Sequence, residues 1–348
     1  MMTEKVEVPR ELEQALDPEW LSQALAPVTG GAPIRSVETV EVIRTVATKV
    51  RFTVAFDGAK GGKEAYCLKG LLDVDESMAR GGAVTVLESD FYGKLAAQLP
   101  VRVPECVARV IDREAQIAVF IMRDLIAQGA RFCSALEPFN PDQASQSLEQ
   151  LARLHTGAVK LDDYPWIGRR VAQFARGEII SQTALQQLLD GPRGETLPAR
   201  TKDAGLLMQA MKALAAQDEH LPSVLVHGDS HAGNIFRTQD GPGLIDWQVL
   251  QRGGWALDVA YHIAAVLPVE VAEANERVLL KHYFDTVRRL GGAVPTDDDA
   301  WAQYRTSVVY GYYLWSITRR VDPAITHVFV ARLGASVTRH ESYRLLGV

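Results

Sequence analysis

Residues 224–236 read VLVHGDSHAGNIF and residues 243–248 read GLIDWQ. These two stretches carry three acid or amide side chains, Asp229, Asn234 and Asp246, at fixed intervals. Ile235 and Phe236 favour a strand, residues 238–243 have the Gly, Pro and Asp typical of a turn, and the chain then becomes strand-like again. The sequence therefore predicts a β-hairpin that brings Asn234 and Asp246 toward one cavity.

The D-x-x-x-x-N interval from Asp229 to Asn234 is typical of phosphoryl transfer. In such sites the Asp accepts the proton of a substrate hydroxyl and the Asn ligates Mg²⁺, while a further Asp holds the metal against the β- and γ-phosphates. We predict Asp229 as the catalytic base, and Asn234 and Asp246 as the metal ligands.

Two other interpretations of this stretch compete with a phosphotransferase. His227 and His231 flank Asp229 and could belong to a hydrolase site for zinc or iron, because imidazole and carboxylate suit these metals. No second His/Asp cluster at recognisable spacing completes such a site. Alternatively, Gly228, Asp229 and Asn234 are ordinary turn residues, which is plausible for each one singly but not for the set with its spacing.

The composition is that of a globular protein. The chain has 348 residues, of which 47% are apolar and 23% charged, and this is long enough for two lobes with a core each. A net charge of −6 argues against a nucleic-acid surface. The first residues carry no apolar leader, and no run of eighteen apolar residues occurs, so we expect no membrane and a cytoplasmic location. Cys67, Cys106 and Cys133 are scattered and odd in number, which favours reduced thiols.

Lys69 ends a predicted strand, residues 64–69, that follows another at residues 50–56. Strand alternation places Ala65, Cys67 and Lys69 on one face, with small side chains suited to lie under adenine and a cation suited to reach phosphates. A buried Lys needs a counter-charge. Glu88, on a predicted helix over residues 84–99, is the candidate ahead of Glu64 and Glu105; the alternative is a solvated position.

The stretch where a phosphate-covering loop is expected contains no glycine. Residues 42–50 read VIRTVATKV, so the hydroxyls of Thr45 and Thr48, or the charges of Arg44 and Lys49, are the candidates for phosphate contact. Strands predicted over residues 105–111 and 116–122 complete the first lobe. Residues 121–125, which include Met122, form the predicted hinge, whose backbone would make hydrogen bonds to adenine.

These motifs together resemble the aminoglycoside-phosphotransferase and choline-kinase-like family of small-molecule kinases, most closely its ecdysteroid-kinase-like branches, which also read H-G-D-x-x-x-x-N and then I-D-[FW]-Q. The resemblance implies an α+β, bilobal, protein-kinase-like fold. Residues 1–124 would form a small nucleotide-binding lobe with an antiparallel sheet and one helix, and residues 125–348 a larger, mostly helical lobe. It also implies ATP and Mg²⁺ as cofactors, a Lys69–Glu88 ion pair, and Asp258 bracing the catalytic loop through backbone N–H groups. A helix-start cap is the equally good alternative for Asp258.

The second lobe is predicted to be mostly helix, over residues 140–159, 201–219, 255–267, 271–290, 297–320 and 325–346. Aromatic side chains crowd the helix at 297–320, namely Trp301, Tyr304, Tyr310, Tyr312, Tyr313 and Trp315. Such a stripe is more often core; if part of it lines the site, the acceptor is a sizeable apolar or aromatic alcohol. The hypothesis is thus an ATP- and Mg²⁺-dependent kinase of a small-molecule hydroxyl, and its alternative is an inactive nucleotide- or ligand-binding module of the same fold.

Overall fold

The computed structural model describes residues 6–44, 47–56, 62–74 and 82–348. The chain forms two compact units, one of residues 1–97 with 103–131 and the other of residues 98–102 with 132–348. The lobe boundary expected at 124/125 falls inside the first of these units. Among the described residues, no helix has the length and apolar character needed to cross a bilayer.

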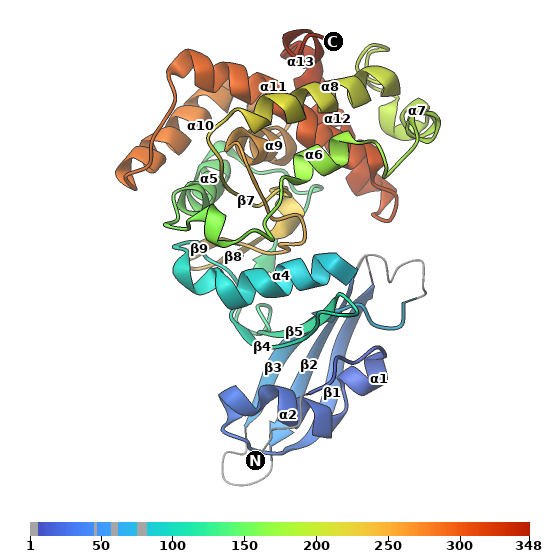
Figure 1. The fold of residues 1–348 in the computed structure, drawn as a ribbon, viewed down its shortest axis with the longest axis vertical. Helices are drawn as coiled ribbons and strands as arrows, with labels where there is room; N and C mark the ends of the chain where they lie inside the picture. Colours follow the sequence, from blue (N-terminus) through green and yellow to red (C-terminus); the bar gives the residue numbers. More distant parts are fainter. Residues whose placement is uncertain (1–5, 45–46, 57–61, 75–81) are drawn as a thin grey trace. The chain divides into compact units, whose positions relative to one another are not determined.

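The first unit is built on a five-stranded antiparallel sheet in the order β1-β2-β3-β5-β4 (Figure 1). Its strands are β1 (Ile34–Arg44), β2 (Thr48–Phe56), β3 (Lys63–Gly70), β4 (Cys106–Asp112) and β5 (Ile117–Arg123). Side chains alternate between the two faces, as the strand period requires. Tyr66 and Leu68 of β3 belong to a hydrophobic core on one face, and Lys69 therefore belongs to the other.

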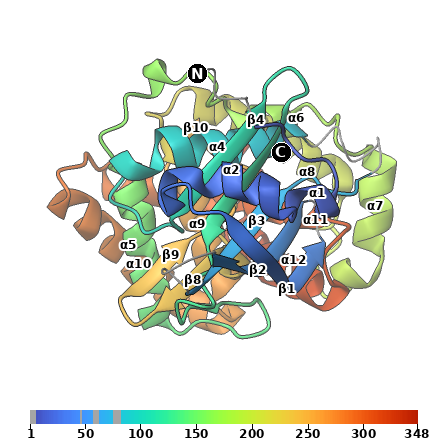
Figure 2. The ribbon, with the colours of Figure 1, turned by 90° about the horizontal axis from the view of Figure 1, so that it is seen from below.

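Within the described residues of the first unit, three α-helices accompany this sheet, where one was expected. They are α1 (Leu12–Ala15), α2 (Pro18–Thr29) and α4 (Gly82–Lys94), followed by the 3-10 turn η1 (Ala96–Gln98). The α2 helix starts because Asp17 accepts from the backbone N–H groups of Glu19 and Trp20 and Pro18 occupies N1. Figure 2 shows α2 lying across the sheet, where Leu21 and Leu25 join the core. This start signal is of the same kind as Asn140-Pro141 and was readable in the sequence.

The second unit is mostly helical and contains the predicted hairpin. Its elements are β6 (Arg131–Phe132), α5 (Pro141–His155), η2 (Leu161–Asp163), α6 (Arg170–Ala175), α7 (Gln182–Asp190), η3 (Pro192–Gly194), α8 (Ala204–Glu219), β7 (Val224–Val226), η4 (Ala232–Asn234), β8 (Ile235–Thr238), β9 (Gly241–Leu244), β10 (Gln251–Gly253), α9 (Ala256–Val266), α10 (Val269–Arg289), α11 (Asp297–Ile317), α12 (Pro323–Arg339) and α13 (Ser342–Leu345). The buried helix α9 packs against α5, α10, α11 and α12 (Figure 1).

The start of α5 is as predicted, because Asn140 and Gln143 form a reciprocal capping box with Pro141 at N1. The prediction of one continuous helix over residues 325–346 is wrong. These residues belong to two helices, α12 and α13, because Glu341 has a φ of +51° and turns the chain between them.

Residues 98–102 belong to the second unit because they bind its hairpin. The Arg102 carbonyl accepts from Leu244 N at 2.9 Å. The Arg102 guanidinium donates to the carbonyl of Gly241 at 2.6 Å and to Thr238 Oγ1 at 2.9 Å. A short segment from the first half of the chain thus supports the two strands that lead to Asp246.

Candidate active site

The first unit contains the expected ion pair between Lys69 and Glu88. Lys69 Nζ lies 2.6 Å from Glu88 Oε2, and the two side chains are only 4% and 1% exposed. Lys69 lies on β3, one residue before its end, and Glu88 lies on α4, so the sheet and the helix fix one partner each. The ion pair fixes the direction of the buried Lys69 side chain. Its role toward phosphates stays a prediction.

Cys67 and Met122 are cross-strand partners in the register of β3 and β5. Cys67 lies two residues before Lys69 and therefore on the same face of the sheet. Burial raises the pKa of the Cys67 thiol to about 11. The thiol is thus neutral near pH 7 and behaves as a small apolar side chain, which suits the predicted contact with adenine.

The structure gives other contacts to two of the residues that are candidates for phosphate contact. Thr48 is buried and its hydroxyl donates to the carbonyl of Leu72 at 3.1 Å, so its donor is already in use. Arg44 forms an ion pair with Asp73 at 2.9 Å. Thr45 lies outside the described residues. None of these contacts adds support to a phosphate role for residues 44–48.

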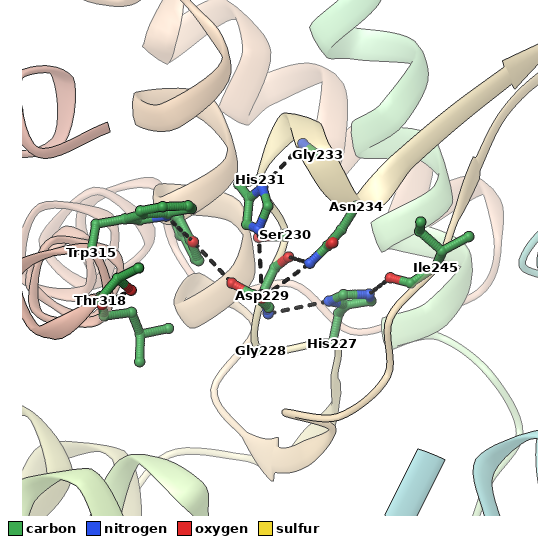
Figure 3. Close-up of polar contacts among 12 residues, drawn as sticks. His227, Gly228, Asp229, Ser230, His231, Gly233, Asn234, Ile245, Trp315 and Thr318 are labelled. Carbon is green, nitrogen blue, oxygen red and sulfur yellow. Dashed lines mark hydrogen bonds and ion pairs between the residues drawn. The ribbon is translucent and has the colours of Figure 1, made fainter. Parts of the chain in front are cut away.

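In the second unit, the base candidate Asp229 accepts hydrogen bonds from a residue of η4 and a residue of α9 (Figure 3). Asn234 Nδ2 donates both to the backbone carbonyl of Asp229, at 2.8 Å, and to its Oδ2, at 3.0 Å. The Tyr261 hydroxyl donates to Oδ1 at 3.0 Å, and Trp315 Nε1 donates to that hydroxyl at 2.5 Å. The D-x-x-x-x-N interval therefore does more than separate the base candidate from the predicted metal ligand. The side-chain amide of Asn234 also orients the carboxylate of Asp229.

These contacts set the charge of Asp229. Burial by itself raises the pKa of this carboxyl, but His231 and then His227 lower it, and the net pKa lies below that of a free aspartate. His231 Nε2 lies 3.5 Å from Asp229 Oδ2. Burial, and then the neighbouring Asp229 carboxylate, raise the pKa of Tyr261 well above its usual value. At neutral pH the pair is an ionised aspartate facing a neutral phenol.

Asp246 lies two residues after the end of β9, in a left-handed backbone conformation with a φ of +67°. The preceding residue joins it to the catalytic loop, since Ile245 N donates to the Asn234 carbonyl at 3.0 Å and the Ile245 carbonyl accepts from His227 Nε2 at 2.9 Å. The charge of Asp246 raises the pKa of Asp229, which places the two carboxylates near each other. The side chain is largely buried.

Asn234 and Asp246 are chemically suited to a hard divalent cation. Because Asn234 Nδ2 is committed to Asp229, its Oδ1 is the atom left to coordinate a metal. Carboxylate and amide oxygens are the ligands that Mg²⁺ takes from proteins. The donor set therefore fits the predicted metal.

Asp258 braces the catalytic loop from α9. Its Oδ2 accepts from His227 N at 2.7 Å, and its Oδ1 accepts from Gly228 N at 2.8 Å. These are the backbone contacts that the resemblance implied, and the side chain is not a helix cap. Gly228 has a φ of +82°, and a Cβ there would meet the carbonyl of Val249, so only glycine fits.

His155 completes the support of Asp258. Its Nε2 lies 3.0 Å from Asp258 Oδ2, and its Nδ1 lies 2.8 Å from the Tyr283 hydroxyl. Burial alone raises the pKa of Asp258. The hydrogen bond and charge of His155, followed by His227 and Gly228, lower it by more, so the net pKa lies below that of a free aspartate.

We expect Asp258→Asn to lower the free energy of unfolding at pH 7 by about 3 kcal/mol. The substitution removes the charge that pairs with His155 and disrupts the buried hydrogen bonds to the backbone of His227 and Gly228. A depressed folded-state pKa stabilises the fold above the unfolded pKa of about 4, and this stabilisation is lost as the pH falls through the folded value. The difference between wild type and variant should therefore shrink below about pH 4. Urea unfolding across pH would measure it, with the exposed Asp163→Asn as control. A difference that does not change with pH would contradict the ionised state of Asp258.

The two histidines on which the metal-hydrolase alternative depends make other contacts in the structure. His227 Nδ1 accepts from Asp229 N at 3.1 Å while its Nε2 donates to Ile245. His231 Nδ1 accepts from Gly233 N at 3.0 Å, and its Nε2 faces Asp229. Both ring nitrogens of each histidine are thus engaged within the loop. The described part of the chain also holds no group of three or more His, Cys, Asp or Glu side chains arranged for a metal ion.

The aromatic stripe of α11 is mainly core. Five of its six side chains, Tyr304, Tyr310, Tyr312, Tyr313 and Trp315, are buried. Several of their polar atoms bond the surrounding backbone; the Tyr310 hydroxyl donates to the Gly228 carbonyl at 2.8 Å. Trp315 packs against Phe329 of α12, with ring centroids 4.1 Å apart, and both rings contact His231. This end of the stripe lies beside the base candidate through His231.

Sequence reasoning missed Tyr261 as a contact of the base. It is three residues after Asp258 on α9, so the helical repeat turns both side chains toward the same loop. That interval was the available signal. Trp315 was noted only as part of the stripe, and nothing local in its segment points to Tyr261.

Comparison with known proteins places these motifs in context. The model of the phosphotransferase enzyme family matches residues 85–292, more than half of the chain. No curated protein matches the sequence. A choline/ethanolamine kinase family protein from Mesorhizobium loti is 18% identical with a TM-score of 0.53, covering 94% of this chain and 97% of its own. At this identity the likeness supports the fold alone.

Two further solved structures are similar over most of their length. A macrolide 2′-phosphotransferase from Brachybacterium faecium is 17% identical with a TM-score of 0.47, covering 92% of this chain and 98% of its own. A choline kinase from Streptococcus pneumoniae is 12% identical with a TM-score of 0.49, covering 93% and 98%.

Proposed function

Because the chain belongs to the phosphotransferase enzyme family, we propose that it transfers the γ-phosphate of ATP to a hydroxyl of a small molecule with the help of Mg²⁺. The observation that carries this proposal is the arrangement of the catalytic loop. An ionised Asp229 is oriented by Asn234 at 3.0 Å, and Asp246 follows on the hairpin that Ile245 fastens to that loop. The narrower likeness to ecdysteroid-kinase-like branches stays a prediction.

Each of these residues then has a separate task. Asp229 holds the acceptor hydroxyl and accepts its proton as the bond to phosphorus forms. Asn234 Oδ1 and the Asp246 carboxylate hold the cation, whose charge stabilises the phosphates during transfer. Lys69, fixed by Glu88, binds nucleotide phosphates. Cys67 offers a small side chain to adenine, and the hinge around Met122 offers backbone hydrogen bonds to it. Asp258 keeps the loop in shape and takes no part in the chemistry.

The acceptor is the open part of this proposal. A sizeable apolar or aromatic alcohol stays a prediction, and it now rests on Trp315 and Phe329, which contact His231 beside the base, rather than on the whole of α11. The alternative, an inactive binding module, is favoured by the glycine-free stretch at 42–50 and by the use of the Thr48 hydroxyl within the protein.

A screen for ADP release separates the two functions. Purified protein would be given ATP, Mg²⁺ and a library of alcohols that spans apolar, aromatic, cationic and anionic molecules. Release of ADP that depends on one alcohol, and that yields a phosphorylated product by mass spectrometry, supports the kinase. Tight ATP binding without ADP release above the rate with water alone would support the binding module.

We expect Tyr261→Phe to shift the acidic limb of the rate profile upward by about one pH unit, because a hydrogen bond that favours the ionised Asp229 is lost. The rate at neutral pH should fall on the order of 10-fold through poorer orientation of the base, with the KM for ATP unchanged. Tyr304→Phe is the matched control, since this buried hydroxyl also donates to a carboxylate, Glu276, at 3.4 Å but away from the loop. Equal profiles for both variants would argue against a role of Tyr261 in placing the base.

A further inference from the structure

Arg170, at the start of α6, is a partly buried guanidinium without an acceptor. Its Nε is enclosed and meets no hydrogen-bond partner, and the side chain forms no ion pair with any residue that the structure describes. Its neighbours differ: Arg169 donates to the Asp218 carbonyl at 3.0 Å and to Ser223 Oγ at 2.6 Å, and Arg252 Nε donates to the Ile167 carbonyl at 2.9 Å. Buried polar groups normally have partners, so Arg170 is an exception that calls for a ligand.

A chain of three hydrogen bonds ties this part of α6 to the catalytic loop. Val171 N, the next residue, donates to Gln251 Oε1 at 2.9 Å. Gln251 Nε2 donates to the Tyr310 hydroxyl at 2.8 Å, and that hydroxyl donates to the Gly228 carbonyl at 2.8 Å. Gly228 immediately precedes the base. The backbone beside Arg170 is therefore connected to the loop that carries Asp229, within one unit of the protein.

The surroundings of Arg170 supply no opposite charge. Burial lowers the pKa of its guanidinium, and only Tyr310 acts in the other direction. No carboxylate in the described ranges contributes to that balance. The guanidinium lies 5.8 Å from the centroid of the Phe174 ring, a distant cation–π contact that satisfies no N–H donor. The residue keeps a partly exposed surface, through which a ligand can reach the terminal nitrogens.

We propose that Arg170 binds an oxyanion, a carboxylate or phosphate group, carried by the acceptor alcohol. Guanidinium pairs with such groups through two parallel hydrogen bonds. The proposal rests on the proposed function, in which the hydroxyl of the acceptor lies against Asp229. The guanidinium interacts with Tyr310, whose hydroxyl bonds the residue before Asp229, so the acceptor is the substrate that we assign to it. The nucleotide phosphates are assigned to Lys69 and to the cation at Asn234 and Asp246. The acceptor is thus an alcohol with an anionic group.

Chemical modification tests the site without any turnover. Phenylglyoxal reacts with accessible arginines, and peptide mapping by mass spectrometry would follow Arg170 in the full-length protein. Inorganic phosphate should slow the reaction at Arg170, by about 10-fold at ten times its dissociation constant. Arg332 is the internal control, because burial also lowers its pKa but its Nη1 already donates to the Ala265 carbonyl at 2.9 Å; phosphate should leave its rate unchanged.

A second arm distinguishes the source of the oxyanion. With the nucleotide site saturated by a non-hydrolysable ATP analogue and Mg²⁺, Arg170 should stay reactive, and phosphate should still protect it. Full protection by the analogue alone would assign the guanidinium to the nucleotide and overturn the proposal. A rate at Arg170 that phosphate does not change, with or without the analogue, would show that no oxyanion binds there and would overturn it as well.

Activity then measures the consequence. Hydroxy acids and their methyl esters would be compared as acceptors in pairs. Arg170→Met should raise the KM for the acid by about 10- to 100-fold and leave that for the ester unchanged, with the KM for ATP kept, and Arg170→Lys should restore part of the loss. Equal changes for acid and ester would contradict the proposal. Phosphate protection in a wild-type protein that releases no ADP with any alcohol would contradict the proposed kinase function and still support the oxyanion site.

Discussion

Asp229→Ala is expected to lower the turnover number for ADP release by about 10²- to 10⁴-fold, the contribution typical of a positioned general base. The affinity for ATP should stay near that of wild type, because the role that we propose for Asp229 is toward the acceptor and not the nucleotide. Calorimetry of ATP binding and a coupled ADP assay on the same preparations would measure both. The acceptor hydroxyl is un-ionised near pH 7, so transfer to it depends on a carboxylate placed beside it.

Two companion variants sharpen this test. Asp240→Ala removes an exposed carboxylate from the turn of the same hairpin and should leave turnover unchanged. Asn234→Ala should lose activity together with part of the Mg²⁺ dependence, since it removes both a proposed metal ligand and the donor that orients Asp229. If Asp229→Ala still turns over within about threefold of wild type, the base assignment fails, and the binding module becomes the better description.

Asp246→Asn is expected to lower turnover by about 10²- to 10³-fold and to raise the Mg²⁺ concentration needed for half-maximal nucleotide binding. The metal supplies several kcal/mol of charge stabilisation to phosphoryl transfer, and the substitution removes one full ligand charge. The fold should be preserved, because asparagine tolerates the left-handed conformation that Asp246 adopts.

Binding of ATP with and without Mg²⁺ reads out this change independently of turnover. Asp240→Asn serves as the matched variant in the same hairpin and should behave as wild type. Wild-type Mg²⁺ dependence in Asp246→Asn would remove this residue from the metal site, and an unfolded variant would be recognised by its melting curve.

The parts of the site that could be predicted are those that a local pattern encodes. The interval from Asp229 to Asn234 and the turn chemistry before Asp246 lie in one loop and the hairpin that directly follows it, so short-range spacing brings them together. Lys69 and Glu88 follow from strand alternation and helical repeat, and they meet at 2.6 Å. Each inference needed only one or two adjacent elements.

The contacts that were not predicted come from distant segments. Tyr261 reaches Asp229 across 32 residues, and Trp315 reaches Tyr261 across 54. No single-sequence pattern specifies which face of α11 meets α9, because α11 carries apolar side chains around most of its circumference. For the same reason the sequence allows its aromatic side chains to be either core or binding surface. In the structure most of them are buried in the core.

The segment 98–102 has a consequence for how the protein is made. Its contacts with the hairpin join residues that are 136 and 139 positions apart, and such long loops close slowly. During synthesis from the N-terminus, Arg102 has to wait until residue 244 has left the ribosome before the edge of β9 is covered. A fragment that begins at residue 132 would lack this cover altogether and expose unpaired strand groups, which favours aggregation. Fragments of the helical unit should therefore carry residues 98–102, supplied in cis by a linker or in trans as a peptide.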